Sequence, residues 1–252
     1  MTRLVIVIVL AVAAAEMGCG SGAGEACVGS LAQAIYGGSA DAEAFGLNDN
    51  APAGAVVAIV TESKPKGWSL CSGVVVAQRF VLTAAHCAPG ALPSAIRVSL
   101  EPSVRPFGSS CASASAAYAV VAITRHPAVD AMLLALTSSA FGLTGVPVVT
   151  SAPSVGQAAI IAGYGLTEMG TFGQRIFAPT TIADVGAGTI EVDSGTDGGA
   201  CVGDSGGPLL VRDASGWKVA GVLSEGSGAC AGQDVYVDTA AIAAWIGSNI
   251  GG

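Results

Sequence analysis

Short apolar runs of strand length recur along most of the chain and alternate with Gly- and Pro-containing turns. They begin at Ala55, Cys71, Ala95, Tyr118 and Ala131 in the first half and at Gln157, Thr189, Pro208, Trp217 and Asp234 in the second. Many short strands at such spacing predict an antiparallel sandwich or barrel rather than a helical bundle. Because 52% of the residues are hydrophobic and only 11% are charged, we expect one large core in a single main domain.

The C-terminal segment has a different pattern, which predicts the single helix of the fold. From Thr239 the sequence reads TAAIAAWIGSN, so that Thr239 can cap the start and Gly247 can mark the end. Ile242, Trp245 and Ile246 fall on one face of such a helix and predict its buried side.

The first residues have the pattern of an export signal. Arg3 precedes an apolar run that is too short to span a bilayer comfortably, and small residues after the run permit cleavage. We therefore expect a signal peptide over residues 1–15, with cleavage as late as residue 18, a propeptide or linker over 16–34, and a folded domain over 35–252. No other stretch suits a membrane span, so the sequence predicts a secreted protein.

Seven cysteines are an odd number for an exported chain, and Cys19 is the outlier. It follows the apolar run in a segment similar to a bacterial lipoprotein attachment site, except that Glu16 stands where such sites have an aliphatic residue. We therefore prefer the interpretation that Cys19 is lost with the leader. A lipid anchor at the cell envelope through Cys19 is the alternative.

Charge and composition exclude several classes of function. The net charge of −8 argues against nucleic acid, whose phosphates would repel the chain. With two His and no paired Cys-x-x-Cys, the sequence predicts no metal site, and nothing in it calls for a cofactor. No internal repeat of about 20 to 50 residues is present, which argues against a repeat architecture.

The segment CVGDSGGP, residues 201–208, is too rich in Gly and Pro for a helix or a central strand and predicts a shaped loop. The loop serves either as a turn or as a holder of Ser205 for chemistry. A Ser nucleophile needs an imidazole base, and only His86 and His126 are available. The imidazole in turn needs a carboxylate, for which Asp130 is the candidate because an apolar run follows it and would bury it.

These segments resemble the chymotrypsin-like, or trypsin-fold, serine endopeptidases. The resemblance is carried, in this order along the chain, by IYGG at Ile35, LTAAHC around His86, DAMLLAL at Asp130, AGYG at Ala162, GDSGGP around Ser205 and VYVDTAAIAAWI at the C-terminus. The order His, Asp, Ser is that of the family. The resemblance implies an all-β fold of two packed six-stranded antiparallel β-barrels with a short C-terminal α-helix, and a protease domain over residues 35–252.

The resemblance also assigns roles to individual residues. Ser205 would attack the scissile carbonyl, His86 would act as base and then acid, and Asp130 would hold His86. The backbone N–H groups of Gly203 and Ser205 would form the oxyanion hole. His126 is the competing imidazole, and we interpret it as structural because Pro127 restrains its backbone and the family has a His-Pro here without a catalytic role.

The family's disulfides correspond to Cys71 with Cys87 and Cys201 with Cys230. Each would close a loop of roughly 15 to 30 residues and stabilise the fold by about 3 kcal/mol in the chain-entropy model. Cys27 and Cys111 have no secure match, and one option is that they join the propeptide to the domain.

In this family a newly formed N-terminal amine pairs with the Asp before the nucleophile, which here implies Ile35 and Asp204 as an activation pair. The alternative for Asp204 is an ordinary solvated loop charge. Ala34 precedes Ile35, where typical zymogens have Arg or Lys. We therefore expect activation by an enzyme that cuts after small residues, or by the chain itself.

The substrate pocket is expected around Gly199, Ser224, Gly226 and Asp234. Gly199 takes the pocket-base position that is Asp in trypsin-type members, whereas Asp234 places a carboxylate on the pocket wall. With Gly226 leaving the entrance open, this arrangement predicts a mixed basic and hydrophobic preference for P1, the substrate residue before the scissile bond. The expected partners are polypeptide substrates and protein inhibitors, and the expected state is a monomer.

Two alternative classes stay open at this point. One is a catalytically silent homologue that acts as a binding module, although such proteins usually lose a member of the triad. The other is an exported β-rich adhesion or structural protein that mimics the motifs.

Overall fold

The computed structural model describes residues 35–48, 52–63, 67–104, 117–138, 145–167, 170–196 and 198–251. All of them belong to one compact unit, Ala32–Gly252. The expected signal peptide and propeptide lie outside the described residues, as do Cys19, Cys27 and Cys111. Within the described ranges, no helix has the length and apolar content that a membrane span requires.

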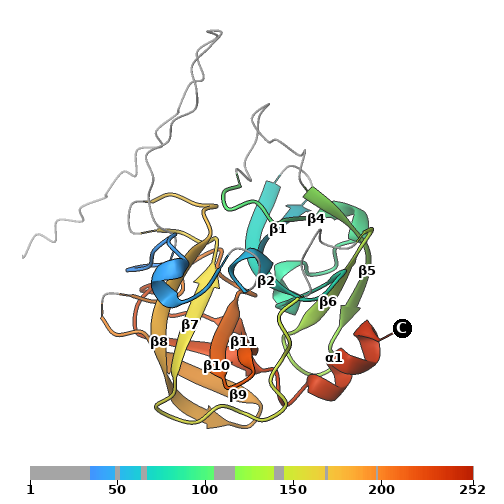
Figure 1. The fold of residues 1–252 in the computed structure, drawn as a ribbon. Coiled ribbons are helices and arrows are strands. Elements are labelled where there is room, and N and C mark those ends of the chain that lie inside the picture. Colours follow the sequence, from blue (N-terminus) through green and yellow to red (C-terminus); the bar gives the residue numbers. More distant parts are fainter. Residues whose placement is uncertain are drawn as a thin grey trace, which may run out of the picture. The chain divides into compact units, whose positions relative to one another are not determined.

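The first half of this unit forms a closed antiparallel barrel (Figure 1). Its strands are β1 (Val56–Ser63), β2 (Gly67–Ala77), β3 (Phe80–Thr83), β4 (Ile96–Ser99), β5 (Ala117–Arg125) and β6 (Met132–Leu136), in the closing order β1-β2-β3-β6-β5-β4. The long run that begins at Cys71 supplies both β2 and β3, which pair as a hairpin. Strand β6 is buried at every position, which explains why its sequence is continuously apolar rather than alternating.

The second half closes into a barrel of the same kind. Its strands are β7 (Ala158–Gly163), β8 (Ile176–Gly186), β9 (Thr189–Asp193), β10 (Pro208–Asp213), β11 (Gly216–Glu225) and β12 (Gln233–Asp238), in the order β10-β11-β12-β9-β8-β7. The expected all-β fold of two six-stranded barrels with one short C-terminal helix is thus confirmed.

Strand β8 is the one strand without a counterpart among the apolar runs of the sequence. Pro179 interrupts it, and a Pro within a run normally argues against a central strand. In the structure Pro179 pairs with Ile160 of β7, whereas the pairing of β8 with β9 begins only at Thr181. The missing N–H of Pro179 therefore interrupts no ladder on the β9 side.

The C-terminal helix α1 spans Ala243–Ile250, and the prediction of its ends was wrong. Thr239 does not cap it, because the Thr239 hydroxyl donates to the Val219 carbonyl of β11 at 2.7 Å. The helix also continues through Gly247. Its buried residue Ile246 lies on the predicted face, and this contact with the core sustains the helix beyond the local stop signal.

Short 3-10 helices lie in two segments of the described chain: η1 (Glu43–Phe45) and η2 (Ala53–Ala55) precede β1, and η3 (Ala85–Cys87) and η4 (Pro93–Ala95) lie between β3 and β4. Contacts between β1 and β7, β2 and β7, β2 and β10, and β3 and β11 join the two barrels. The loops that carry the expected site residues are positioned by this packing.

Candidate active site

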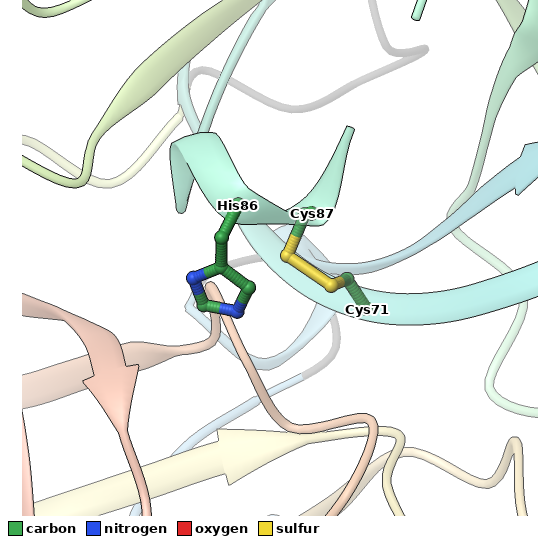
Figure 2. Close-up of side chains that lie close together, drawn as sticks. All are labelled: Cys71, His86 and Cys87. Carbon is green, nitrogen blue, oxygen red and sulfur yellow. A yellow bond between two sulfur atoms is a disulfide. The ribbon is translucent and has the colours of Figure 1, made fainter. Parts of the chain in front are cut away.

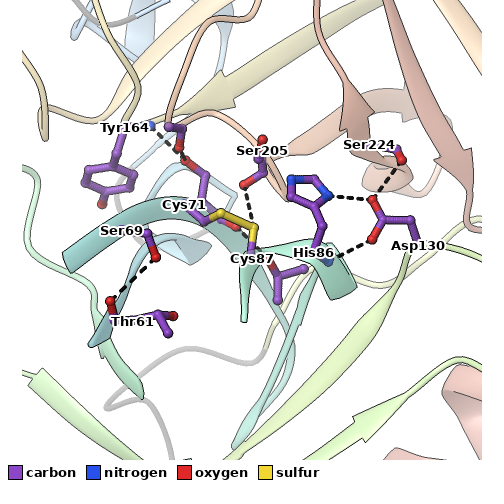
Figure 3. Close-up of a disulfide and its surroundings, with 12 residues drawn as sticks. Thr61, Ser69, Cys71, His86, Cys87, Asp130, Tyr164, Ser205 and Ser224 are labelled. Carbon is purple, nitrogen blue, oxygen red and sulfur yellow. Dashed lines mark hydrogen bonds and ion pairs between the residues drawn. A yellow bond between two sulfur atoms is a disulfide. The ribbon is translucent and has the colours of Figure 1, made fainter. Parts of the chain in front are cut away.

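The three residues expected to form a catalytic triad come from loops of both barrels. His86 lies in η3, directly after β3, and Asp130 lies between β5 and β6. Ser205 lies in the Gly-rich loop between β9 and β10. Figure 3 shows Ser205 and Asp130 on opposite sides of the His86 imidazole. The fold therefore brings three sequence-distant residues together.

The carboxylate of Asp130 is held from three directions. The His86 Nδ1 atom lies 2.6 Å from Oδ2, and the His86 backbone N–H donates to Oδ1 at 2.9 Å. The hydroxyl of Ser224, at the end of β11, donates to Oδ2 at 2.8 Å (Figure 3). With Nδ1 engaged by Asp130, Nε2 is the ring nitrogen that can exchange a proton with another group.

These contacts shift both pKa values. The hydrogen bond to Asp130 raises the pKa of His86, although partial burial opposes the shift. Burial alone would raise the pKa of Asp130, but hydrogen bonds from His86 and Ser224 outweigh it and lower that pKa to about 2. The Asp130 side chain is still 26% exposed, so it is less buried than the apolar run after it suggested. The carboxylate is therefore charged across the neutral pH range.

A cleft of about 630 Å³ lies against His86 and Ser205. Its other lining residues are Thr61, Glu62, Ser69, Leu70, Cys71, Cys87, Pro89, Gly90, Ala91, Val202 and Gly203. No hydrogen bond joins the Ser205 hydroxyl to His86 in this structure, and such bonds are often long before substrate binds. The cleft gives a substrate access to both groups at once.

The disulfide between Cys71 and Cys87 lies beside the His86 ring (Figure 2). The three side chains place their possible metal-binding atoms within 4.8 Å of one another. Both sulfurs are bonded to each other, however, and a disulfide does not offer the thiolates that bind zinc. The disulfide therefore ties the His86 segment to strand β2, and we do not interpret the three side chains as a metal centre.

The loop before Ser205 presents two backbone donors. The N–H groups of Asp204 and Gly206 donate to carbonyl oxygens at 3.0 and 2.8 Å, whereas those of Gly203 and Ser205 have no acceptor among the described residues. Gly203 adopts φ = +100°, and a Cβ at this position would lie 2.8 Å from the Gly165 Cα. Only glycine suits this position, since both its backbone angle and its surroundings exclude a side chain.

Comparisons with known proteins identify the family of the chain. A family model described as Trypsin matches residues 48–246. Trypsin alpha-4 of Lucilia cuprina is 30% identical over 206 residues, which cover 71% of this chain and 77% of the relative. Trypsin iota of Drosophila melanogaster is 28% identical, with 70% and 77% covered, and a trypsin of Pleuronectes platessa is 27% identical, with 71% and 80% covered.

The chain belongs to the trypsin family. The resemblance noted in the sequence is thereby confirmed, and the protein is a serine endopeptidase that hydrolyses peptide bonds. Both disulfides expected of a trypsin-family member, Cys71–Cys87 and Cys201–Cys230, are present.

Asp234, which the sequence predicts on the wall of the substrate pocket of this trypsin-family chain, is not among the residues that line the cleft beside His86 and Ser205. Asp234 is fully buried, and its oxygens accept N–H groups from Ala200 at 2.9 Å and from Ser227 at 3.1 Å. Burial raises its pKa. A Cβ at Gly226 would lie 3.5 Å from Asp234 Oδ1, so this acid borders the space that Gly226 leaves open. A Cβ at Gly199 would lie 2.9 Å from the Ala231 Cα, which leaves no room there for an aspartate side chain.

Asp204 is buried, with 1% of its surface exposed, so the alternative of a solvated loop charge is wrong. Its oxygens accept N–H groups from Gly165 at 2.7 Å and Cys201 at 2.9 Å, yet burial raises its pKa to about 7. Ile35 is also fully buried, and Tyr36 next to it forms a bridge with Gly199. Both expected members of the activation pair are thus buried.

Two residues have contacts that sequence reasoning missed. Ser224 was expected to line the substrate pocket, but its hydroxyl is bound to Asp130. Only its position as the first residue of the SEGSG segment indicated a special role. His126 accepts the N–H groups of Ala128 and Val129 on Nδ1, and its ring packs edge-on against Trp245 at 5.0 Å. These contacts suit the structural interpretation of His126.

Proposed function

We propose that the chain is a secreted serine endopeptidase that cleaves polypeptides through an acyl-enzyme intermediate. Ser205 attacks the scissile carbonyl, His86 takes the Ser205 proton and passes it to the leaving amine, and Asp130 orients His86 and stabilises its cationic form. The observation that carries the proposal is the imidazole itself, bound to Asp130 at 2.6 Å and lining one cleft with Ser205.

The Gly203 and Ser205 N–H groups form the oxyanion hole in this proposal. Both donors lack an acceptor among the described residues and belong to the loop that lines the cleft. Such donors stabilise the negative charge that develops on the carbonyl oxygen, and each contributes on the order of 3 kcal/mol in other enzymes.

The proposed P1 preference is mixed, basic and hydrophobic. Asp234 offers a negative charge to a substrate cation, and Gly226 leaves space beside that charge. A cation would also offset the burial that raises the Asp234 pKa. Profiling a peptide library varied at P1 tests the preference, and exclusive cleavage after Ala or Val would contradict it.

Cleavage before Ile35 is proposed to activate the enzyme by freeing an amine that pairs with Asp204. A buried carboxylate without a cation is costly, which gives the pairing its driving force. In the uncleaved chain Ile35 also has φ = +59°, which β-branched residues strongly disfavour. Cleavage of the Ala34–Ile35 bond removes this restraint. Mass spectrometry of the active enzyme should find Ile35 at the N-terminus, and an active enzyme beginning at Met1, Glu16 or Cys19 would contradict the proposal.

Secretion is supported by the apolar leader in the sequence and by the two disulfides, which persist in oxidising compartments. Protein inhibitors as partners and a monomeric state remain predictions. The silent binding module is the second candidate, but the intact His86–Asp130 contact and the two N–H groups of the Ser205 loop that have no acceptor among the described residues favour the enzyme.

A fluorophosphonate probe separates these two functions. We expect the processed protein to be labelled at Ser205 and to cleave peptides, and Ser205→Ala to lose both properties. His86→Ala should abolish cleavage, whereas His126→Ala should retain it because His126 packs against Trp245. Equal loss in both His variants, or no labelling of the processed wild type, would overturn the proposal.

A further inference from the structure

Ser72 is a fully buried polar residue of strand β2, within the run that is buried from Leu70 to Val76. Its hydroxyl donates to the Gly203 carbonyl at 3.0 Å and accepts the Tyr164 N–H at 2.9 Å. Its backbone N–H donates to the Ser205 carbonyl at 2.8 Å. One residue of the first barrel is thus hydrogen-bonded to both Gly203 and Ser205, whose N–H groups have no acceptor among the described residues.

These bonds restrain the direction of the oxyanion donors. Gly203 has no side chain that could limit its backbone rotation, and its angle of φ = +100° is open to glycine alone. The Ser72 hydroxyl fixes the direction of the Gly203 carbonyl. This bond limits the backbone rotation of Gly203 and thereby the direction of its N–H. The Ser205 carbonyl is restrained in the same way by the Ser72 N–H.

The attachment is itself rigid. The Ser72 carbonyl accepts the Thr83 hydroxyl of β3 at 2.7 Å, and a Cβ at Gly206 would lie 2.5 Å from that same carbonyl oxygen. The Ser205 loop therefore packs directly on the β2 backbone. A displacement of Ser72 would be transmitted to the loop rather than absorbed by a gap.

We propose that Ser72 is a positioning residue for the oxyanion hole, which holds the Gly203 and Ser205 N–H groups toward the cleft. The inference rests on the proposed function of these groups. It differs from a merely structural role, because a buried hydroxyl that only completes the packing would affect stability without a selective effect on the chemical step.

The test is Ser72→Ala, which removes the hydroxyl and adds no bulk. We expect kcat to fall by about 10- to 100-fold, less than the loss of a donor itself, with KM nearly unchanged. Affinity for a peptide aldehyde, whose adduct with Ser205 carries an oxyanion-like oxygen, should fall by a similar factor.

Thr83→Val is the matched control, since it removes a hydrogen bond to the same residue but leaves the hydroxyl bond to Gly203. We expect its kcat to fall clearly less than that of Ser72→Ala, because the bond between the Ser72 hydroxyl and the Gly203 carbonyl stays in place. A Ser72→Ala variant that changes only KM, loses no more kcat than Thr83→Val, or no longer folds would overturn the inference.

Hydrogen exchange separates this inference from the proposed function. The Tyr164 amide should exchange faster in Ser72→Ala than in Thr83→Val, whether or not the protein cleaves peptides. An unlabelled wild type with this exchange difference would refute the proposed catalysis alone. A labelled, active wild type with equal exchange and equal kcat in the two variants would refute the role of Ser72 alone.

Discussion

At the scale of single residues, we expect the contact between His86 and Asp130 to determine the pH dependence of activity. The hydrogen bond to Asp130 raises the pKa of His86 above 6.5, and only the neutral imidazole can accept the Ser205 proton. We therefore expect kcat/KM to fall as the pH drops through this raised pKa. Asp130→Asn should lower kcat on the order of 10⁴-fold and move the acid limb to lower pH, which the pH profile of kcat/KM measures.

His126→Asn is the control for this profile, because its imidazole contacts Trp245 and a turn rather than the cleft. Its acid limb should coincide with that of the wild type. An acid limb that stays in place in Asp130→Asn would show that another group controls it.

The buried carboxylate of Asp204 makes a second residue-scale prediction, for the stability of the uncleaved chain. Its pKa is about 7 in the folded chain against 3.8 as the ordinary value, because burial disfavours the charged form. Between these pH values the folded state holds the proton that the unfolded state has released, so this group makes stability fall as the pH rises from about 4 to 7. Asp204→Asn in a Ser205→Ala background should flatten that fall, as measured by Tm against pH.

Asp193→Asn, at an exposed site, should leave the pH dependence of Tm unchanged. A slope that is the same with and without Asp204 would contradict the assignment. In the cleaved enzyme an ammonium of Ile35 beside Asp204 would favour the charged carboxylate and remove the same penalty.

At the scale of elements, the loop between β9 and β10 depends on the backbone of Gly203. A Cβ there would meet the Gly165 Cα at 2.8 Å at a φ of +100°. Gly203→Ala should therefore displace the oxyanion N–H and lower kcat by about 10²- to 10³-fold with a smaller change in KM. Gly228→Ala is the matched control, since nothing lies within 4 Å of its added Cβ. Steady-state kinetics of both variants test the prediction, and an equal loss of kcat in the two would contradict it.

At the scale of the whole molecule, Tyr164 joins the two barrels. Its buried hydroxyl contacts the carbonyl oxygens of Val56 at 3.2 Å and Glu101 at 2.9 Å. Burial raises the pKa of Tyr164, so the hydroxyl stays a neutral donor. Tyr164→Phe should lower the free energy of unfolding by about 1 to 3 kcal/mol, because buried carbonyl oxygens lose their donor. Urea unfolding measures the loss, and an unchanged free energy would show that the barrels are held together elsewhere.

Local sequence patterns were sufficient for most of the strands, whereas the arrangement in two six-stranded barrels was predicted from the family resemblance. The apolar runs predicted every strand of the two barrels except β8. Pro179 argued against a strand there, but the pairing of β8 with β9 begins only at Thr181, so the missing Pro179 N–H interrupts no hydrogen bond to β9. The helix was placed correctly but its ends were not, because the Thr239 hydroxyl bonds to β11 and core packing extends α1 past Gly247. The ends of strands and helices depend on such long-range contacts. The periodicity of apolar residues reflects only residues that are close together in the sequence.

The candidate site divides in the same way. The two His residues and the GDSGGP loop limited the catalytic candidates, and the resemblance to the trypsin-fold family reduced them to His86, Asp130 and Ser205. Only the tertiary structure showed that the Ser224 hydroxyl is hydrogen-bonded to Asp130 and the Ser72 hydroxyl to Gly203. These partners are 94 and 131 residues apart in the sequence. Barrel closure brings these partners together, and no local pattern can encode a hydrogen bond whose two ends meet only when both barrels have formed.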